Sequence, residues 1–174
     1  MILLGLNMTS EIKDDTMSKL IRLNIGCGRR MKKGYVNIDI RKTRPEVVVA
    51  DIRRLPYPEN SVDEIFANDS YEHISWAESQ SLLIHWISKL KSGGVLDMQM
   101  PNILGLMKLI NKQTEPKGIE MAIRKIFGGQ DYKFNYHYTS GHPVLIKHYL
   151  RKAGIKGKID ITSKGCNMKV YAIK

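Results

Sequence analysis

The sequence has few cysteines and no long uninterrupted apolar run. Two cysteines, Cys27 and Cys166, are too few for a disulfide framework, and no Cys/His spacing indicates zinc, so we expect no metal. Isolated cysteines are typical of a reducing compartment, which predicts a cytoplasmic protein. The opening MILLGL lacks a basic start and is too short for a signal core or a membrane span.

Acidic residues are scarce relative to basic ones. The chain has 28 Lys and Arg against 17 Asp and Glu, a net charge of +11, and an isoelectric point near 9.6. This balance favours anionic partners, either a polynucleotide or a small acidic molecule. The basic residues are spread along the whole chain, however, so a solvated, solubilising surface is an equal alternative.

A length of 174 residues suits one domain that can bury its own core. We predict a single domain over residues 19–174, preceded by an extension, residues 1–18, that is helical or poorly ordered. Met8 and Met17 leave open a later natural start. Residues 10–18 are a candidate cover for an exposed sheet face.

Apolar runs and helical periodicities alternate along the chain, which is typical of helices packed on a mostly parallel sheet. Strands are predicted over Arg22–Ile25, Tyr35–Ile40, Glu46–Ala50, Asp63–Ala67 and Val95–Met100. Helices are predicted over Ser75–Leu90, Ile103–Lys112, Gly118–Phe127 and Val144–Ala153. The tail, Lys156–Thr162 and Met168–Ile173, reads as an antiparallel hairpin.

The first predicted connection is too short for a whole helix. Only about six residues separate Gly28 from the second strand, whereas a parallel crossover normally needs about a dozen. We therefore predict a doubly wound, Rossmann-like α/β fold with its first helix shortened. The later helix from Ser75 is expected to start with a capping box that ends at Glu78, and to place Trp76 on its apolar face.

The most informative segment is the one that joins the first two predicted strands. Gly26 and Gly28 follow the first strand, and glycines there let the backbone approach a ligand closely. Asp39 ends the second strand, where a carboxylate can accept both hydroxyls of a ribose. Met31 stands where a dinucleotide motif has its third glycine, so the pattern indicates a nucleoside cofactor. Tight-turn glycines and a capping aspartate are the alternative.

Three further polar residues, Asp51, Asn68 and Asp69, also fall at predicted strand ends. Ligands of parallel sheets bind beyond the carboxyl ends of the strands. The shared position therefore favours one site, although Asp51 alone is explained equally by a turn.

The motifs LN-x-G-C-G and G-x-x-N-x-D resemble those of small class I S-adenosylmethionine-dependent methyltransferases; their residues here are Leu23, Asn24, Gly26, Cys27, Gly28, Gly34, Asn37 and Asp39. The resemblance covers most of the chain. It implies S-adenosylmethionine as cofactor, with Gly26 and Gly28 beside the methionine part and Asp39 on the ribose. Asp51 would accept from the adenine amino group while Ile52 packs on the ring. The predicted cofactor residues are Asn24, Gly26, Cys27, Gly28, Asp39, Ile40, Asp51, Ile52, Asn68 and Asp69.

Two histidines are the candidate catalytic residues. The segment that ends in Glu72-His73-Ile74 resembles the strand-four ending of the family, commonly L-E-H-I, and His73 there either faces the methyl group or is structural. The loop Gly128–Pro143 resembles a segment that lies over the cofactor, and it contributes His137 and His142. Its alternating aromatic residues are also typical of a half-buried strand.

We therefore predict methyl transfer from S-adenosylmethionine to an unidentified polar or anionic acceptor. The motif [DN]-P-P-[YFW] of enzymes that methylate base amines is absent after Asn68, which disfavours that acceptor. The alternatives are a basic nucleic-acid-binding module without catalysis and, less favoured, a nicotinamide-dependent oxidoreductase.

Overall fold

Between residues 20 and 174, which the computed structural model describes, seven strands form one sheet in the order β3-β2-β1-β4-β5-β7-β6. The strands are β1 (Arg22–Ile25), β2 (Val36–Asp39), β3 (Val48–Val49), β4 (Val62–Asn68), β5 (Leu90–Pro101), β6 (Ile159–Lys164) and β7 (Asn167–Ile173). Strands β1 to β5 pair in parallel, and β7 runs antiparallel between β5 and β6. The predicted fold class is confirmed. The predicted extension 1–18 lies outside the described residues.

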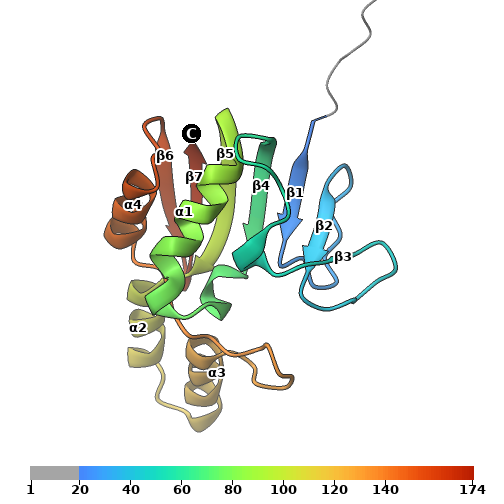
Figure 1. Ribbon diagram of the computed structural model, residues 1–174. Helices are drawn as coiled ribbons and strands as arrows, with labels where there is room; N and C mark the ends of the chain where they lie inside the picture. The colour runs from blue at the N-terminus through green and yellow to red at the C-terminus, as the bar shows by residue number, and fades with distance from the viewer. Residues whose placement is uncertain (1–19) are drawn as a thin grey trace, which may run out of the picture.

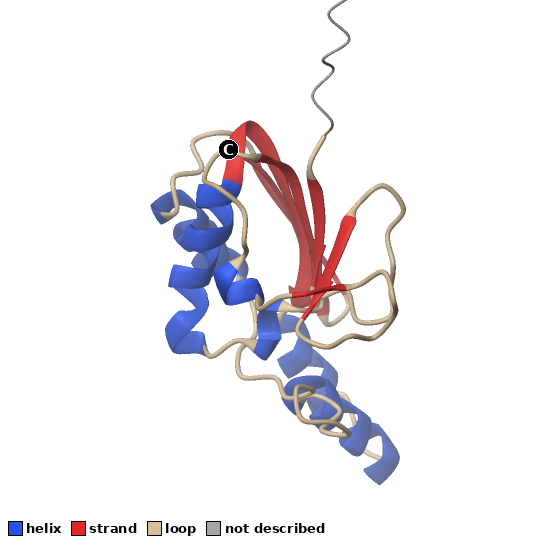
Figure 2. Ribbon diagram, turned by 45° about the vertical axis from the view of Figure 1, so that its right-hand side comes forward, coloured by secondary structure: helices blue, strands red, loops and turns tan. Residues whose placement is uncertain are grey.

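The helices of the described chain lie on one side of this sheet and beneath it. They are α1 (Ser79–Lys89), α2 (Ile103–Asn111), α3 (Pro116–Phe127) and α4 (Pro143–Lys152), with short 3₁₀ turns η1 (Ile52–Arg54), η2 (Tyr71–His73) and η3 (Trp76–Glu78). Helices α1 and α4 contact each other and cover one face (Figure 2). Helices α2 and α3 form a pair below the carboxyl ends of the parallel strands (Figure 1).

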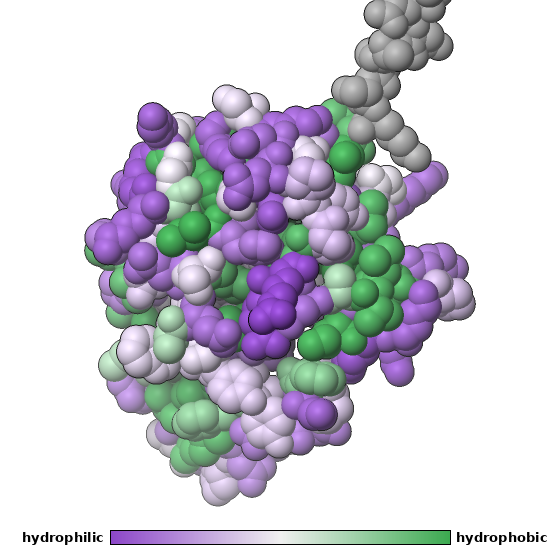
Figure 3. All heavy atoms as spheres, in the orientation of Figure 1, coloured by the Kyte–Doolittle hydropathy of each residue, from purple (hydrophilic) through white to green (hydrophobic). Residues whose placement is uncertain are grey.

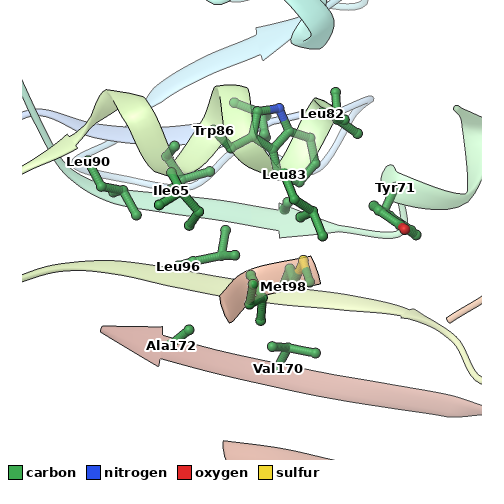
Figure 4. Packing of buried hydrophobic residues seen from close by; sticks show 14 of the residues in the cluster. Ile65, Tyr71, Leu82, Leu83, Trp86, Leu90, Leu96, Met98, Val170 and Ala172 are labelled. Atoms are coloured by element: carbon green, nitrogen blue, oxygen red, sulfur yellow. The ribbon is translucent and has the colours of Figure 1, made fainter. Parts of the chain in front are cut away.

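The core lies between α1 and the covered face of the sheet. Trp86 and Leu83 of α1 face side chains from the neighbouring strands β4, β5 and β7, including Ile65, Leu96 and Val170, and all five are fully buried (Figure 4). The Trp86 indole N–H donates to the Ile52 carbonyl oxygen at 2.9 Å, so its one polar atom is satisfied. Burial of such large side chains contributes about 1.5–3 kcal/mol each.

No helix lies over the opposite face of the sheet among residues 20–174 (Figure 2). The ten-residue loop 26–35 between β1 and β2 packs there instead. The Asn24 amide donates to the Asn37 side-chain oxygen at 2.7 Å, and that oxygen also accepts from the Lys32 backbone N–H at 2.8 Å. The Lys32 ammonium lies 4.1 Å from the centre of the Phe66 ring. These contacts hold the loop where a crossover helix would lie. No helical residue lies between β1 and β2, so the first helix, which was predicted to be short, is replaced by a loop.

The start of the first long helix differs from the prediction. Helix α1 begins after Glu78, and Ser75 instead caps η3, where its hydroxyl accepts from the Ala77 backbone N–H at 3.3 Å. The Glu78 carboxylate lies 3.7 Å from the Arg53 guanidinium and forms no capping box. Because Trp76 lies on η3, it is 72% exposed, not on the apolar face of the helix.

The start of β5 also differs. The predicted strand starts at Val95, but β5 already begins at Leu90, directly after α1, and contains both Gly93 and Gly94. Its register against β4 shifts between Val62 and Glu64, which accommodates the extra residues. The predicted strand is therefore five residues too short at its start.

Exposed apolar side chains gather over the α2–α3 pair and at the β3 edge of the sheet (Figure 3). They include Leu104, Met107, Met121, Phe127, Val48 and Val49. Helices long and apolar enough to cross a bilayer are absent from residues 20–174.

Candidate active site

A cavity of about 1260 Å³ opens where the parallel strands end. The loop after β1, the end of β2, η1, η2 and the loop 128–142 all line it. A pocket for one drug-sized ligand measures about 300–1,000 Å³. The cavity is therefore large enough for a nucleoside cofactor together with a second molecule.

The two glycines after β1 have different surroundings. Gly26 and Gly28 both have positive φ, 63° and 54°, a conformation that is costly for other residues. A Cβ at Gly26 would overlap the side chain of Ser70, whereas a Cβ at Gly28 would meet no atom within 4 Å. Gly26 is therefore required by packing within the protein, and Gly28 is the glycine with open space beside it.

Asp39 is buried beneath the glycine loop. Its Oδ2 accepts from the Gly28 backbone N–H at 2.8 Å, and its Oδ1 accepts from the Arg41 backbone N–H at 2.9 Å. Each carboxylate oxygen has a second lone pair, so the same group can also accept hydroxyls from a ligand. The carboxylate thus fixes the shape of the loop as well as lining the cavity.

Asn24 and Cys27 both belong to the first motif, but only Cys27 lines the cavity. Asn24 is buried behind the loop, where its amide donates to the Arg30 carbonyl at 2.9 Å, and it does not line the cavity. Cys27 lines the cavity, but burial and then the nearby Asp39 carboxylate raise the pKa of its thiol to about 11. It is therefore a neutral thiol at physiological pH. Asn37, which our site prediction omitted, is the partner of Asn24; its place in the N-x-D motif was the available signal.

Asp51 lies at the far side of the same cavity. The Arg53 side chain donates to both of its oxygens, at 2.7–3.1 Å, and these hydrogen bonds lower the pKa of the carboxyl. The carboxylate therefore stays ionised, and Arg53 already uses part of its capacity to accept hydrogen bonds. Ile52 is buried in the core, whereas Ile40 is 42% exposed and offers the larger apolar surface to the cavity.

The end of β4 brings Asn68 and Asp69 to the middle of the cavity. Asp69 accepts hydrogen bonds from Asn68 at 2.9 Å, Gln99 at 3.0 Å and Arg30 at 3.0 Å. Its φ of 53° turns the chain sharply from the strand into η2. This turn directs the next residues, 70–73, to the end of the cavity opposite Asp39.

His73 and His137 meet at that end although they lie far apart in the sequence. Their ring centres are 5.1 Å apart, and burial followed by the charge of His73 lowers the pKa of His137. His73 Nδ1 lies 2.9 Å from the Tyr136 carbonyl oxygen, and His137 Nδ1 lies 3.1 Å from the Lys125 carbonyl oxygen. A carbonyl only accepts, so each Nδ1 carries a proton, and the lone pair of the neutral form of each ring lies on Nε2.

Glu72 is a residue of this cluster that our site prediction omitted. It is only 1% exposed, and its Oε2 has no hydrogen-bond partner. Burial raises the pKa of its carboxyl to about 8. One ligand-capable atom from each of Glu72, His73 and His137 lies within 4.8 Å of the others. Its position beside His73 after a predicted strand end was the signal that could have revealed it.

The loop 128–142 is irregular and is attached at both ends of the cavity. The backbone N–H groups of Tyr138 and Thr139 donate to the Glu72 carbonyl at 2.8 and 3.3 Å. The Arg41 guanidinium lies 4.1 Å from the centre of the Tyr132 ring. The half-buried strand considered as an alternative is not formed, and His142 does not line the cavity.

Residues 23–97 match the family model described as "Methyltransferase domain". The fold is similar to that of a SAM-dependent methyltransferase from Archaeoglobus fulgidus, with a TM-score of 0.63 and 18% identity over 90% of this chain and 87% of that chain. An S-adenosylmethionine-dependent methyltransferase from Mesorhizobium loti is similar with a TM-score of 0.58 and 12% identity, over 90% of this chain and 91% of that one. No curated protein sequence matches the chain.

The domain match runs from β1 into β5 and so contains the glycine loop, Asp39 and Asp51. The two solved structures extend the similarity of the fold over nine-tenths of the chain. The domain match indicates methyl transfer as the activity, and both similar structures are described as dependent on S-adenosylmethionine. Residues 23–97 are therefore similar to a methyltransferase domain, and the fold of the described chain is similar to those of the two methyltransferase structures.

Proposed function

We propose that this enzyme methylates a polar, anionic acceptor that binds between the cofactor and the Glu72–His73–His137 cluster. The observation that carries the proposal is one cavity with two different ends. The strand order puts Asp39 and Asp51, which follow β2 and β3, on one side of β1, and puts the end of β4, which leads to His73 and its neighbour His137, on the other. The volume of about 1260 Å³ leaves room for both molecules.

The cofactor is proposed to lie along the strand ends. Asp39 would hold the ribose hydroxyls, and the loop at Gly26 and Gly28 would border the methionine part. Asp51 would accept from the adenine amino group, with Ile40 and Ile52 beside the ring. Cys27, Asn68 and Asp69 would line the middle of the cofactor. Asn24 is proposed to act indirectly, because it holds the loop from behind.

Transfer itself needs little from the protein. The sulfonium is already activated, so positioning the reactants and excluding water are the main tasks. A proton acceptor is needed only when the acceptor is a hydroxyl or a charged amine. His73 and His137 are our candidates, because both rings offer an Nε2 lone pair at the same end of the cavity.

The acceptor's negative charge is inferred from the cations of the cavity. Four cations line it without an ion pair to another residue in the range 20–174: Arg29, Lys42, Lys125 and Lys133. The other lining arginines are paired with carboxylates, as in Arg41 with Asp39 at 3.5 Å. Four cations without a carboxylate partner favour an acidic small molecule, such as a carboxylate or phosphate ester.

Calorimetric titration with S-adenosylhomocysteine and, as a control, NAD tests the cofactor site. We expect micromolar binding of the first and none of the second. NAD binding without S-adenosylhomocysteine binding would contradict the proposal.

The net charge of +11 also makes a polynucleotide acceptor worth testing. A polynucleotide bound through many phosphates loses affinity steeply with added salt. A single-stranded oligonucleotide titrated at about 50 and 200 mM salt distinguishes the two acceptor classes. We expect weak binding without methylation.

The free state of both cysteines supports the proposal of a reducing, cytoplasmic location.

A further inference from the structure

We infer that Glu72, His73 and His137 form a binding site for a divalent transition-metal ion at the acceptor end of the cavity. The inference deepens the proposed function, on which its chemical role rests. Three observations carry it: the geometry of the cluster, the state of the two imidazoles and the isolation of the buried carboxylate.

The geometry is close to what one ion requires. A ligand atom from each residue lies within 4.8 Å of the other two. Metal–nitrogen and metal–oxygen bonds of about 2.0–2.2 Å hold two ligands of one ion no more than about 4.4 Å apart. Side-chain movements of less than about an ångström would therefore complete the site.

Both imidazoles are already oriented as metal ligands. The carbonyls of Tyr136 and Lys125 each accept from an Nδ1–H, which fixes the tautomer and leaves Nε2 as the ligand atom. Hydrogen bonding of the second ring nitrogen to a carbonyl is the usual support of a metal-bound histidine. Two independent segments, η2 and the loop 128–142, supply the same arrangement.

One oxygen of this carboxyl group, Glu72 Oε2, lacks a partner within the described chain. It is buried and accepts no hydrogen bond, although the side chain lines the cavity. A buried polar atom without a partner is costly, and coordination of a metal is one way to satisfy it. No lysine or arginine within residues 20–174 forms an ion pair with Glu72. A cation would satisfy it.

The donor set selects the class of ion. Two imidazole nitrogens and one carboxylate suit Zn²⁺, Fe²⁺, Co²⁺ or Ni²⁺, whereas Mg²⁺ and Ca²⁺ prefer oxygen ligands alone. Three protein ligands also leave a position open, as in catalytic metal sites.

The open position gives the ion a role in methyl transfer. An acceptor hydroxyl bound there would lose its proton to solvent more readily, because the ion lowers its pKa. The oxygen lone pair then forms the O–C bond while the C–S bond breaks, and the bonding pair passes to sulfur as S-adenosylhomocysteine. The preferred acceptor is therefore a hydroxyl compound. With the ion bound, each Nε2 lone pair is used to hold it and the proton passes to solvent; without the ion, the histidines keep the role of proton acceptor proposed above.

The test is calorimetric titration of the full chain with Zn²⁺, after removal of metals with a chelator and without cofactor. We expect one ion per chain. Replacing a supporting neighbour of a metal ligand usually costs 10–100-fold, so losing a ligand should weaken binding at least about tenfold. His73→Ala, His137→Ala and Glu72→Gln each remove one ligand. His148→Ala and Glu120→Gln, at exposed positions of α4 and α3, are the matched controls and should bind within about twofold of the parent.

Absence of Zn²⁺ binding, or equal binding by all five variants, would overturn the site, as would tighter binding of Mg²⁺ than of Zn²⁺. Circular dichroism identifies a variant that does not fold. In that case, Zn²⁺ should still protect His73 and His137 of the parent chain from diethyl pyrocarbonate, and modification that is unchanged by Zn²⁺ counts against the site. S-adenosylhomocysteine is titrated separately. If the chain binds S-adenosylhomocysteine normally but does not bind Zn²⁺, only the metal site is refuted. If it binds Zn²⁺ but not S-adenosylhomocysteine, the proposed function is refuted.

Discussion

The two ends of the cavity are built in different ways. At the cofactor end, Asp39 holds the amide of Gly28, and both belong to one short segment around a parallel strand pair. At the acceptor end, His73 and the Tyr136 carbonyl that orients it are 63 positions apart. The first end is fixed by local backbone geometry, whereas the second depends on how a long loop attaches to η2.

This difference predicts separate responses to mutation. Changes at the cofactor end should alter affinity and stability together, because the same hydrogen bonds shape the loop and face the ligand. Changes at the acceptor end should alter turnover with little effect on cofactor binding, because only interactions made in the transition state change the chemical step.

His137→Ala should have the largest effect, a fall in kcat of about 10²–10⁴-fold, the range typical of a lost proton acceptor or its equivalent. Cofactor affinity should stay within about threefold. Methylation rates with an identified acceptor and titrations of S-adenosylhomocysteine measure the two quantities, with His148→Ala as control. If His137→Ala weakened cofactor binding while kcat at saturating cofactor stayed unchanged, His137 would belong to the cofactor end. The two ends of the cavity would then not respond separately to mutation.

Asp39→Ala should weaken S-adenosylmethionine and S-adenosylhomocysteine at least about tenfold. A hydrogen bond to a charged group contributes about 1.5–3 kcal/mol, and this carboxylate also fixes the Gly28 amide. Calorimetry measures the change, and Asp160→Ala at an exposed position of β6 controls for the lost charge. Unchanged affinity would refute the ribose assignment.

Gly26→Ala and Gly28→Ala should separate packing from ligand contact. Each places a Cβ at positive φ, which costs about 1–2 kcal/mol of unfolding free energy. Gly26→Ala should be the more destabilising, because its Cβ also overlaps Ser70, and Ser70→Gly should recover part of that loss. Urea denaturation measures both. Equal destabilisation by the two variants, with no recovery, would show that the Ser70 contact is unimportant.

The smallest expected effect is alkylation of Cys27. A pKa raised to about 11 means a neutral thiol below that pH, so the reactive thiolate is about one part in 10⁴ at pH 7 and rises about tenfold per pH unit. Iodoacetamide labelling, followed by mass spectrometry in a Cys166→Ser background, should increase accordingly from pH 7 to 9 and fall with S-adenosylhomocysteine present. Fast labelling at pH 7 would contradict the buried thiol.

The same contrast explains what the sequence could predict. Glycines, Asp39 and Asp51 follow apolar runs directly, so their shared place at strand ends could be inferred from local pattern. The meeting of His137 with Glu72 could not, because it depends on hydrogen bonds from an irregular loop to the Glu72 carbonyl. The start of α1 was misplaced because a 3₁₀ turn takes up the Ser75 cap, and the start of β5 was misplaced because the strand continues through two glycines. The role of each predicted site residue stays a prediction.

The loop that replaces the first crossover helix has a consequence for the order of folding. Paired residues of β1 and β2, such as Leu23 and Val36, are 13 positions apart, whereas Arg22 of β1 and its β4 partner Glu64 are 42 apart. Shorter loops lose less entropy on closure, and local contacts form faster. The strand pair that carries the cofactor loop is therefore expected to form early. The acceptor end depends on the loop 128–142, so we expect it to assemble only after the strands of the sheet have paired.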